Sequence, residues 1–118
     1  MGNPFWHIEF RTKDVAKAKK FYEGLFEWEF DENHKDYTIF RTGEEVSGGI
    51  MENPASSGMP SHWVPVIEVE DIHASTQKAV QLGAKISQDV TEEGEWGWTS
   101  TIIDPTGAMI HLFQQRRK

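Results

Sequence analysis

The chain has 118 residues, of which 37% are apolar and 12% aromatic, and carries a formal net charge of −7 at neutral pH. This length suffices for one domain with a modest core. The acidic balance argues against a nucleic-acid surface, and the absence of cysteine excludes disulfides and thiolate metal sites. The sequence shows neither the ~18 apolar residues of a membrane helix nor the basic and apolar regions of a signal peptide. We therefore expect a cytoplasmic protein that binds no membrane and no nucleic acid.

The first half of the chain predicts a strand, a helix and then three more strands, from the alternation and the helical spacing of its apolar residues. The predicted bounds are 5–10 for the first strand, 15–26 for the helix, and 27–30, 37–41 and 46–51 for the later strands, with a polar loop over 31–36. Asp14 is expected to cap the helix. The pair Gly48-Gly49 within a strand indicates a bulge or the close approach of another group to the backbone.

The second half of the chain repeats this order after a segment of turn-forming residues over 54–60. The predicted bounds are 61–69 for a strand, 72–82 for a helix, and 84–86, 98–103 and 109–114 for three strands, with a polar loop over 88–94. Asp71 is expected to cap this helix and Gly83 to end it. Asp104-Pro105-Thr106-Gly107 has the chemistry of a type I turn.

The two halves form an internal repeat, which decides the predicted fold. We expect an α+β protein in which two tandem βαβββ modules form a curved eight-stranded mixed sheet around a cleft. The modules are predicted over about 4–53 and 61–115, joined by the linker over about 54–60, within a single domain over 1–118. Neither half alone could bury both faces of so small a sheet. The inward faces of the first and last strands of each module would line the cleft.

Three segments carry a resemblance to a known family. They are residues 14–28, with the pattern FY-x-x-x-F-x-W, residues 69–72 with 82–85, and the turn over 104–107. In this order and spacing the chain resembles the vicinal-oxygen-chelate superfamily, which includes glyoxalase I, the bleomycin- and fosfomycin-resistance proteins and the extradiol dioxygenases. The resemblance implies a homodimer, a small-molecule ligand, and in the enzymes one divalent metal at the base of the cleft.

The resemblance also implies positions for the metal ligands. The first family ligand lies seven residues before the helix-capping Asp, which is His7 here, and the last lies seven residues after the Asp of the turn, which is His111. The other two family positions correspond to Gly49 and Val64, which offer no ligand atom. Two protein ligands are fewer than the three of a usual catalytic zinc site. True glyoxalase I activity is therefore not expected, and the cofactor is either one divalent metal (Zn, Ni, Mn or Fe) or none.

The remaining candidate residues are expected on the inward faces of the strands. Glu9 and Glu68 are candidate catalytic bases, although a glutamate on an inner face is as often the partner of Arg11 or of a neighbouring histidine. The residues expected to line a ligand pocket are Arg11, His62, Val64, Trp98 and Phe113.

Two functions remain open at this point. One is a metal-dependent lyase, isomerase or dioxygenase that acts on a small oxygen-rich molecule with His7 and His111. The other is a metal-free small-molecule binding protein of the drug-sequestering resistance type. In that case His7 and His111 either contact an anionic or hydroxylated ligand or are buried and hydrogen-bonded.

Overall fold

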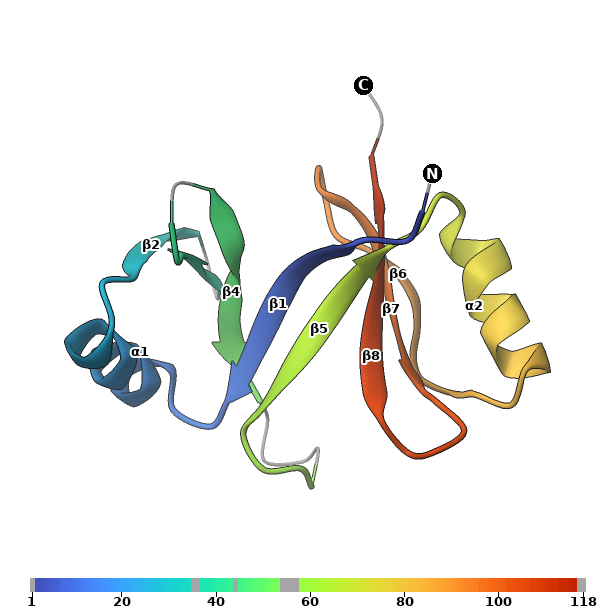
Figure 1. The fold of residues 1–118 in the computed structure, drawn as a ribbon, viewed down its shortest axis with the longest axis horizontal. Coiled ribbons are helices and arrows are strands. Elements are labelled where there is room, and N and C mark those ends of the chain that lie inside the picture. Colours follow the sequence, from blue (N-terminus) through green and yellow to red (C-terminus); the bar gives the residue numbers. More distant parts are fainter. Residues whose placement is uncertain (1, 35–36, 44, 54–57, 117–118) are drawn as a thin grey trace. The chain divides into compact units, whose positions relative to one another are not determined.

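The computed structural model describes residues 2–34, 37–43, 45–53 and 58–116. The elements in chain order, labelled in Figure 1, are β1 (Phe5–Thr12), α1 (Val15–Leu25), β2 (Glu29–His34), β3 (Tyr37–Arg41), β4 (Val46–Glu52), β5 (His62–Glu68), α2 (Ile72–Gln81), β6 (Lys85–Glu92), β7 (Gly97–Ile103) and β8 (Met109–Gln115). Within the described residues, neither helix has the length and apolar character needed to cross a bilayer.

The chain divides into two compact units, which we call the first and second modules. The first module is His7–Val64, and the second combines Met1–Trp6 with Pro65–Lys118. Strand order is β2-β3-β4-β1 in the first and β5-β8-β7-β6 in the second. Each contains one parallel pair, β1 with β4 or β5 with β8, and otherwise antiparallel pairs. The α+β class with two βαβββ modules is thus confirmed, while the predicted linker over 54–60 lies mostly outside the described residues.

The core of the first module lies between α1 and one face of its strands. Asp14 caps the helix as predicted, and its side chain accepts a hydrogen bond from the Lys17 N–H at 3.0 Å. The buried core consists of Phe10, Phe40 and Ile50, against which α1 packs Val15, Ala18 and Tyr22 together with the aromatic rings of Trp28, Phe30 and Trp63. Because strand side chains alternate, the odd-numbered residues of β1 lie on the opposite face.

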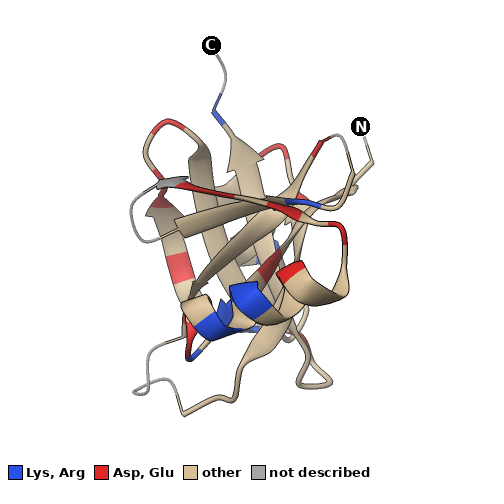
Figure 2. Cartoon of the chain, turned by 90° about the vertical axis from the view of Figure 1, so that its left-hand side faces the viewer, with Lys and Arg blue, Asp and Glu red and all other residues tan. Residues whose placement is uncertain are grey.

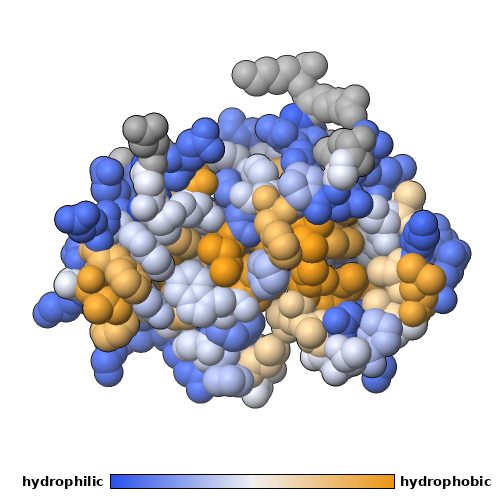
Figure 3. All heavy atoms as spheres, viewed as in Figure 1, coloured by the Kyte–Doolittle hydropathy of each residue, from blue (hydrophilic) through white to orange (hydrophobic). Residues whose placement is uncertain are grey.

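The outer side of α1 combines apolar and basic side chains. Phe21 and Leu25 are 60% and 56% exposed, and apolar atoms gather over this helix in the surface view of Figure 3. Lysines of the same helix appear as blue bands in Figure 2, in a chain whose net charge is −7. α1 therefore stabilises its module through one side only.

The core of the second module lies between α2 and the corresponding face of its strands. Its buried residues are Val69, Ile72, Ile102 and Leu112, with Ile67, Ala79, Ala84, Val90, Trp98 and Ile110 packed around them. Two polar contacts fix α2 on these strands. The buried hydroxyls of Thr76 and Ser100 lie 2.8 Å apart, and the side-chain oxygen of Gln114 accepts a hydrogen bond from the Ile72 N–H at 2.8 Å. The second contact satisfies one of the exposed amides of the helix start.

The predictions of polar loops over 31–36 and 88–94 were wrong in large part. The structure continues β2 through Asp31 to His34 and β6 through Thr91 to Glu92, while residues 35–36 lie outside the described part. Both strands pair antiparallel with a neighbour, and both pairings contain register irregularities. Backbone pairing with β3 and β7 holds these polar residues in strands although their sequence has no apolar alternation. β2 and β6 are also the last strands in their modules' order, where polar side chains are expected.

Candidate functional site

The face of the first module opposite α1 carries the polar residues of β1. Phe10 belongs to the core beneath α1, so His7, Glu9 and Arg11 lie on the other face by alternation. The register places Glu9 beside Gly49 and Arg11 beside Met51 on β4. The prediction that His7 and Glu9 share a face is therefore confirmed within this module.

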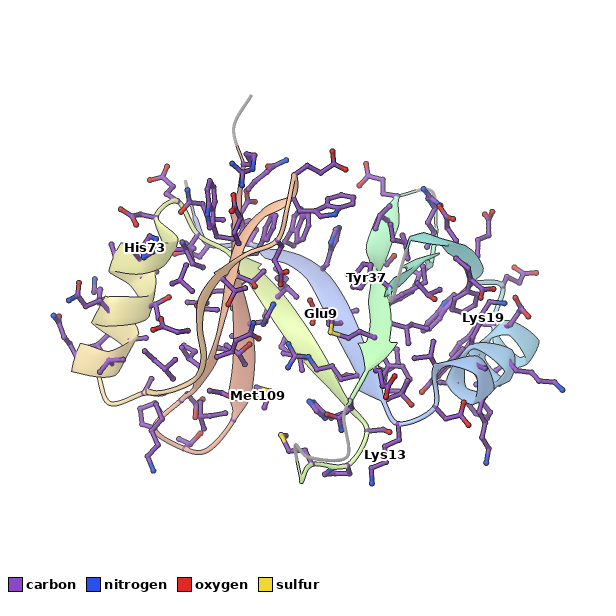
Figure 4. All side chains as sticks on the ribbon, turned by 180° about the vertical axis from the view of Figure 1, so that it is seen from behind. Glu9, Lys13, Lys19, Tyr37, His73 and Met109 are labelled. Carbon is purple, nitrogen blue, oxygen red and sulfur yellow. The ribbon has the colours of Figure 1, made fainter. Side chains whose placement is uncertain are left out.

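Tyr37 of β3 covers Gly49 on the same face. A Cβ atom built on Gly49 would lie 2.0 Å from Cζ and 2.2 Å from the hydroxyl oxygen of the Tyr37 side chain. Gly49 is also the β4 neighbour of Glu9, so the Tyr37 ring covers the strand position next to Glu9; both residues are labelled in Figure 4. The close approach indicated by the glycine pair is confirmed. The group that approaches Gly49 was missed, because only the three-dimensional pairing of β3 with β4 brings Tyr37 there.

Glu9 and Arg11 form an ion pair in this position. The Nε and Nη2 atoms of Arg11 both approach Oε1 of Glu9, at 3.4 and 3.3 Å, and the two side chains are only 11% and 18% exposed. Burial raises the pKa of Glu9, while the positive charge and hydrogen bonds of Arg11 act in the opposite direction. The expected role of Glu9 as a partner of Arg11 is thus observed, and the negative charge of the carboxylate is compensated locally.

Two histidines of the first module differ in their surroundings. Burial lowers the pKa of His7, so its ring is neutral at neutral pH. His62 Nδ1 lies 2.7 Å from the Pro60 carbonyl oxygen. Since a carbonyl only accepts, Nδ1 carries a proton. The Nε2 atom of His62 is buried and has no hydrogen-bond partner among the described residues.

His111 in the second module is held by a hydroxyl. Its Nδ1 lies 2.7 Å from Oγ1 of Thr101, its cross-strand neighbour on β7, and the residue is only 2% exposed. The only atom of this ring that could bind a metal is therefore Nε2. Glu68 and Phe113 lie on the same face of the strands as His111, because β5 pairs with β8 in this register.

Three predicted pocket residues have structural roles in the second module or at its boundary. The Phe113 ring stacks on Trp6 with centroids 4.0 Å apart, and Val64 is fully buried. Trp98 packs on the helix-facing side in the core against α2, with the Arg116 guanidinium 4.4 Å from its ring centre. Trp98 therefore lies on the face opposite His111, because Trp98 pairs with Gln114 and is offset from Thr101 by an odd number of residues.

The donor side chains of this chain differ from those of the metal site that the resemblance implies. Among the described residues, no group of three or more His, Asp or Glu side chains is arranged to share a metal ion. The two family positions without a donor are occupied by Gly49, covered by the Tyr37 ring, and by the buried aliphatic Val64. These residues do not fit a metal held by three protein ligands. The assignment of His7 and His111 as ligands stays a prediction.

Tandem βαβββ modules with one parallel and two antiparallel pairings each define the class of protein. The model of the Glyoxalase/Bleomycin resistance protein/Dioxygenase superfamily matches residues 5–112. The chain therefore belongs to this superfamily, and the resemblance drawn from the sequence is confirmed.

The similar proteins differ in what their names describe. The chain is 35% identical over 123 residues to the putative glyoxylase CFP32 of Mycobacterium tuberculosis, covering 98% of this chain and 47% of CFP32. It thus spans about half the length of the curated relatives that it matches. The structure resembles hypothetical protein BH1468 of Bacillus halodurans, with a TM-score of 0.70, 15% identity, and 100% and 98% of the two chains covered. It also resembles an extradiol ring-cleaving dioxygenase of Brevibacterium fuscum, with a TM-score of 0.69, 15% identity, and 96% and 32% covered.

Proposed function

We propose that this chain is a glyoxalase-family domain that binds a small oxygen-rich molecule on the face of the first module with His7, Glu9 and Arg11, without a metal held by the protein. The observation that carries the proposal is the Tyr37 ring, which fills the space above Gly49 that a ligand side chain at that position would need. A polar, largely buried group of this kind is typical of binding sites in clefts.

Physical chemistry supports binding over Lewis-acid catalysis at this face. A catalytic metal needs several protein donors and an open position for substrate. The face instead offers a neutral imidazole, a compensated ion pair and a phenol. These groups recognise a ligand through hydrogen bonds, which need no metal to hold the ligand in place.

Elemental analysis together with metal titration tests this proposal. We expect purified protein to carry much less than one equivalent of Zn, Ni, Mn or Fe, and calorimetric titration with Zn²⁺ or Ni²⁺ to show no tight site. His7→Ala should leave this result unchanged. One tightly held metal ion per chain that His7→Ala removes would refute the metal-free proposal.

A metal-dependent lyase, isomerase or dioxygenase is the second candidate function. It is favoured by the 35% identity to proteins named putative glyoxylase and by the neutral state of His7, which is the form that binds metals. In this case His7 and His111 are the ligands, and Glu9 and Glu68 are candidate bases. Loss of bound metal in both His7→Ala and His111→Ala, but not in His73→Ala on the exposed side of α2, would support it.

The proposed assembly is a homodimer located in the cytoplasm. The exposed Phe21 and Leu25 side chains support self-association, because contiguous apolar surface is often an interaction site. Light scattering at micromolar concentration tests this: we expect twice the mass of the 13.5 kDa chain. A single-chain mass would contradict the proposal.

A further inference from the structure

We propose that His62 is a ligand-binding residue of the first module, and that its Nε2 atom accepts a hydrogen bond from a hydroxyl or N–H group of the bound small molecule. This inference rests on the proposed function, because it names one residue that binds the ligand and the chemical group that the ligand must carry. It starts from one observation. The Nε2 atom of His62 is buried and has no hydrogen-bond partner among the described residues.

His62 lies on the face of the first module that carries the polar residues of β1. Its neighbour Trp63 stacks on Phe10 with ring centroids 4.2 Å apart, and both rings belong to the core beneath α1. Successive side chains of a strand point to opposite faces. The side chain of His62 therefore points away from α1, toward the face on which the proposed function places the ligand.

Cross-strand contacts place His62 next to Arg11 on this face. The Ser61 hydroxyl donates to the Thr12 hydroxyl oxygen at 3.4 Å, and the ring stack described above lies further along the same two strands. Arg11 and His62 each lie between these two contacts in the sequence. They are therefore neighbours across β1 and the part of β5 that belongs to the first module.

The Pro60 carbonyl fixes the orientation of the imidazole ring. His62 Nδ1 donates a hydrogen bond to this oxygen at 2.7 Å. The buried Asn53 amide donates to the carbonyl oxygens of Met59 and Pro60, at 2.8 and 3.4 Å, and the Asn53 N–H donates to the Thr12 carbonyl oxygen at 2.7 Å. A ring held in this way through Nδ1 presents Nε2 in one fixed position.

A buried nitrogen in this position indicates a hydrogen-bond donor on the ligand. Buried polar atoms are nearly always hydrogen-bonded, and an unsatisfied one costs free energy. In the neutral form of the ring the proton on Nδ1 leaves Nε2 as an acceptor, so its partner must be a donor. A metal ion would also suit this nitrogen, but in the described part of the chain no three His, Asp or Glu side chains are arranged to share one.

His62 as a whole is only half-buried, so part of the residue reaches solvent although Nε2 does not. Binding therefore requires the side chains that cover Nε2 to move when the donor group of the ligand arrives. Side-chain rearrangements of this kind are common when proteins bind a partner.

Two probes of similar size differ in whether they can donate. Catechol carries two adjacent hydroxyl groups, whereas 1,2-difluorobenzene has the same ring and fluorine atoms in their place. Each is titrated into ¹⁵N-labelled protein at about pH 8, where an ordinary histidine is neutral. Chemical-shift changes of the β1 amides locate the probe on this face. Two-bond ¹H–¹⁵N spectra of the imidazole rings show whether Nε2 of His62 accepts a hydrogen bond.

Two variants have the loss of Nε2 in common and nothing else. His62→Asn keeps an N–H group near the position of Nδ1, so Pro60 retains a donor, and His62→Phe keeps the volume of the ring. We expect each to weaken catechol binding by about 2- to 10-fold, the value of one ordinary hydrogen bond. His73→Asn, at an exposed position of α2, is the matched control and should leave it unchanged. The affinity for 1,2-difluorobenzene should be lower than that for catechol and the same in all variants.

The outcomes separate this inference from the proposed function. If catechol shifts the β1 amides but binds both His62 variants as tightly as the wild type, His62 does not bind the ligand and the binding proposal stands. Weaker binding in only one variant would assign the effect to the Pro60 contact or to ring volume, and equal affinity for the two probes would remove the need for a donor; either result overturns the inference. If catechol causes no shifts on this face, both proposals are overturned. Preserved thermal unfolding of each variant shows that it folds.

Discussion

Gly49→Ala tests the contact on which the site is built. The added Cβ would lie 2.0 Å from Cζ of Tyr37, whereas carbon atoms in contact prefer about 3.5–4.0 Å. The ring must therefore move by about 1.5–2 Å, and overpacking of this kind typically costs about 1–3 kcal/mol. Gly49 does not adopt a positive φ, so alanine itself is compatible with the backbone.

A double-mutant cycle isolates this contact. In a Tyr37→Ala background the same Gly49→Ala change should be neutral, or stabilising by about 0.4–1 kcal/mol through the lower entropy of the unfolded chain. The coupling free energy between the two positions should therefore be about 1–3 kcal/mol. It is measured from urea unfolding followed by tryptophan fluorescence, which the five tryptophans of the chain permit.

Gly48→Ala is the matched control. Its Cβ would lie 1.7 Å from the backbone oxygen of Ile8, not from a side chain, so Tyr37→Ala should not rescue it. Equal destabilisation by Gly49→Ala in both backgrounds would refute the placement of the Tyr37 ring and, with it, the reason given for the metal-free site.

Three further predictions concern the scaffold of the second module. Asp71→Ala should destabilise the protein by about 0.5–2 kcal/mol, because its side chain accepts the Ala74 N–H at 3.0 Å; urea unfolding at neutral pH measures the loss, and an unchanged midpoint would contradict the cap. Ser100→Ala should cost about 1–3 kcal/mol, because it leaves the buried Thr76 hydroxyl without its 2.8 Å partner; adding Thr76→Val should recover most of the loss, and failure to recover it would assign the effect to packing. Hydrogen bonds from the Thr106 hydroxyl and from nearby backbone amides lower the pKa of Asp104. The ionised Asp104 carboxylate therefore adds to the free energy of unfolding at pH values above its ordinary pKa of 3.8. This stabilisation is lost as the pH falls through the lowered pKa. The difference in urea midpoint between wild type and Asp104→Ala should therefore shrink on acidification toward pH ~2, and a difference that grows would reverse the assigned sign.

The sequence identified the family and most secondary-structure elements, because the features that indicate them are either local or repeated in the two halves of the chain. Helix caps at Asp14 and Asp71, apolar spacing along each helix, and the turn at 104–107 are encoded within a few residues of each other. Alternation also placed His7 and Glu9 on one face of β1. It failed for β2 and β6, where backbone pairing holds polar residues in strands without an apolar signal.

The sequence predicted only part of the candidate site. Spacing selected His7 and His111, and showed that Gly49 and Val64 offer no ligand atom. It could not show that Thr101 engages His111 Nδ1 or that Trp98 packs against α2. Both contacts depend on which residues of another element lie opposite in the folded module.

The sequence by itself determined the repeat, the superfamily and the glycine that makes room on β4. Only the tertiary structure decided what fills that room, because the register of β3 on β4 and the tilt of one side chain bring Tyr37 onto Gly49. On its other side, Gly49 pairs with Glu9 of β1, which forms the ion pair with Arg11. The position that lacks a metal-ligand side chain in the sequence is, in the folded module, covered by an aromatic ring.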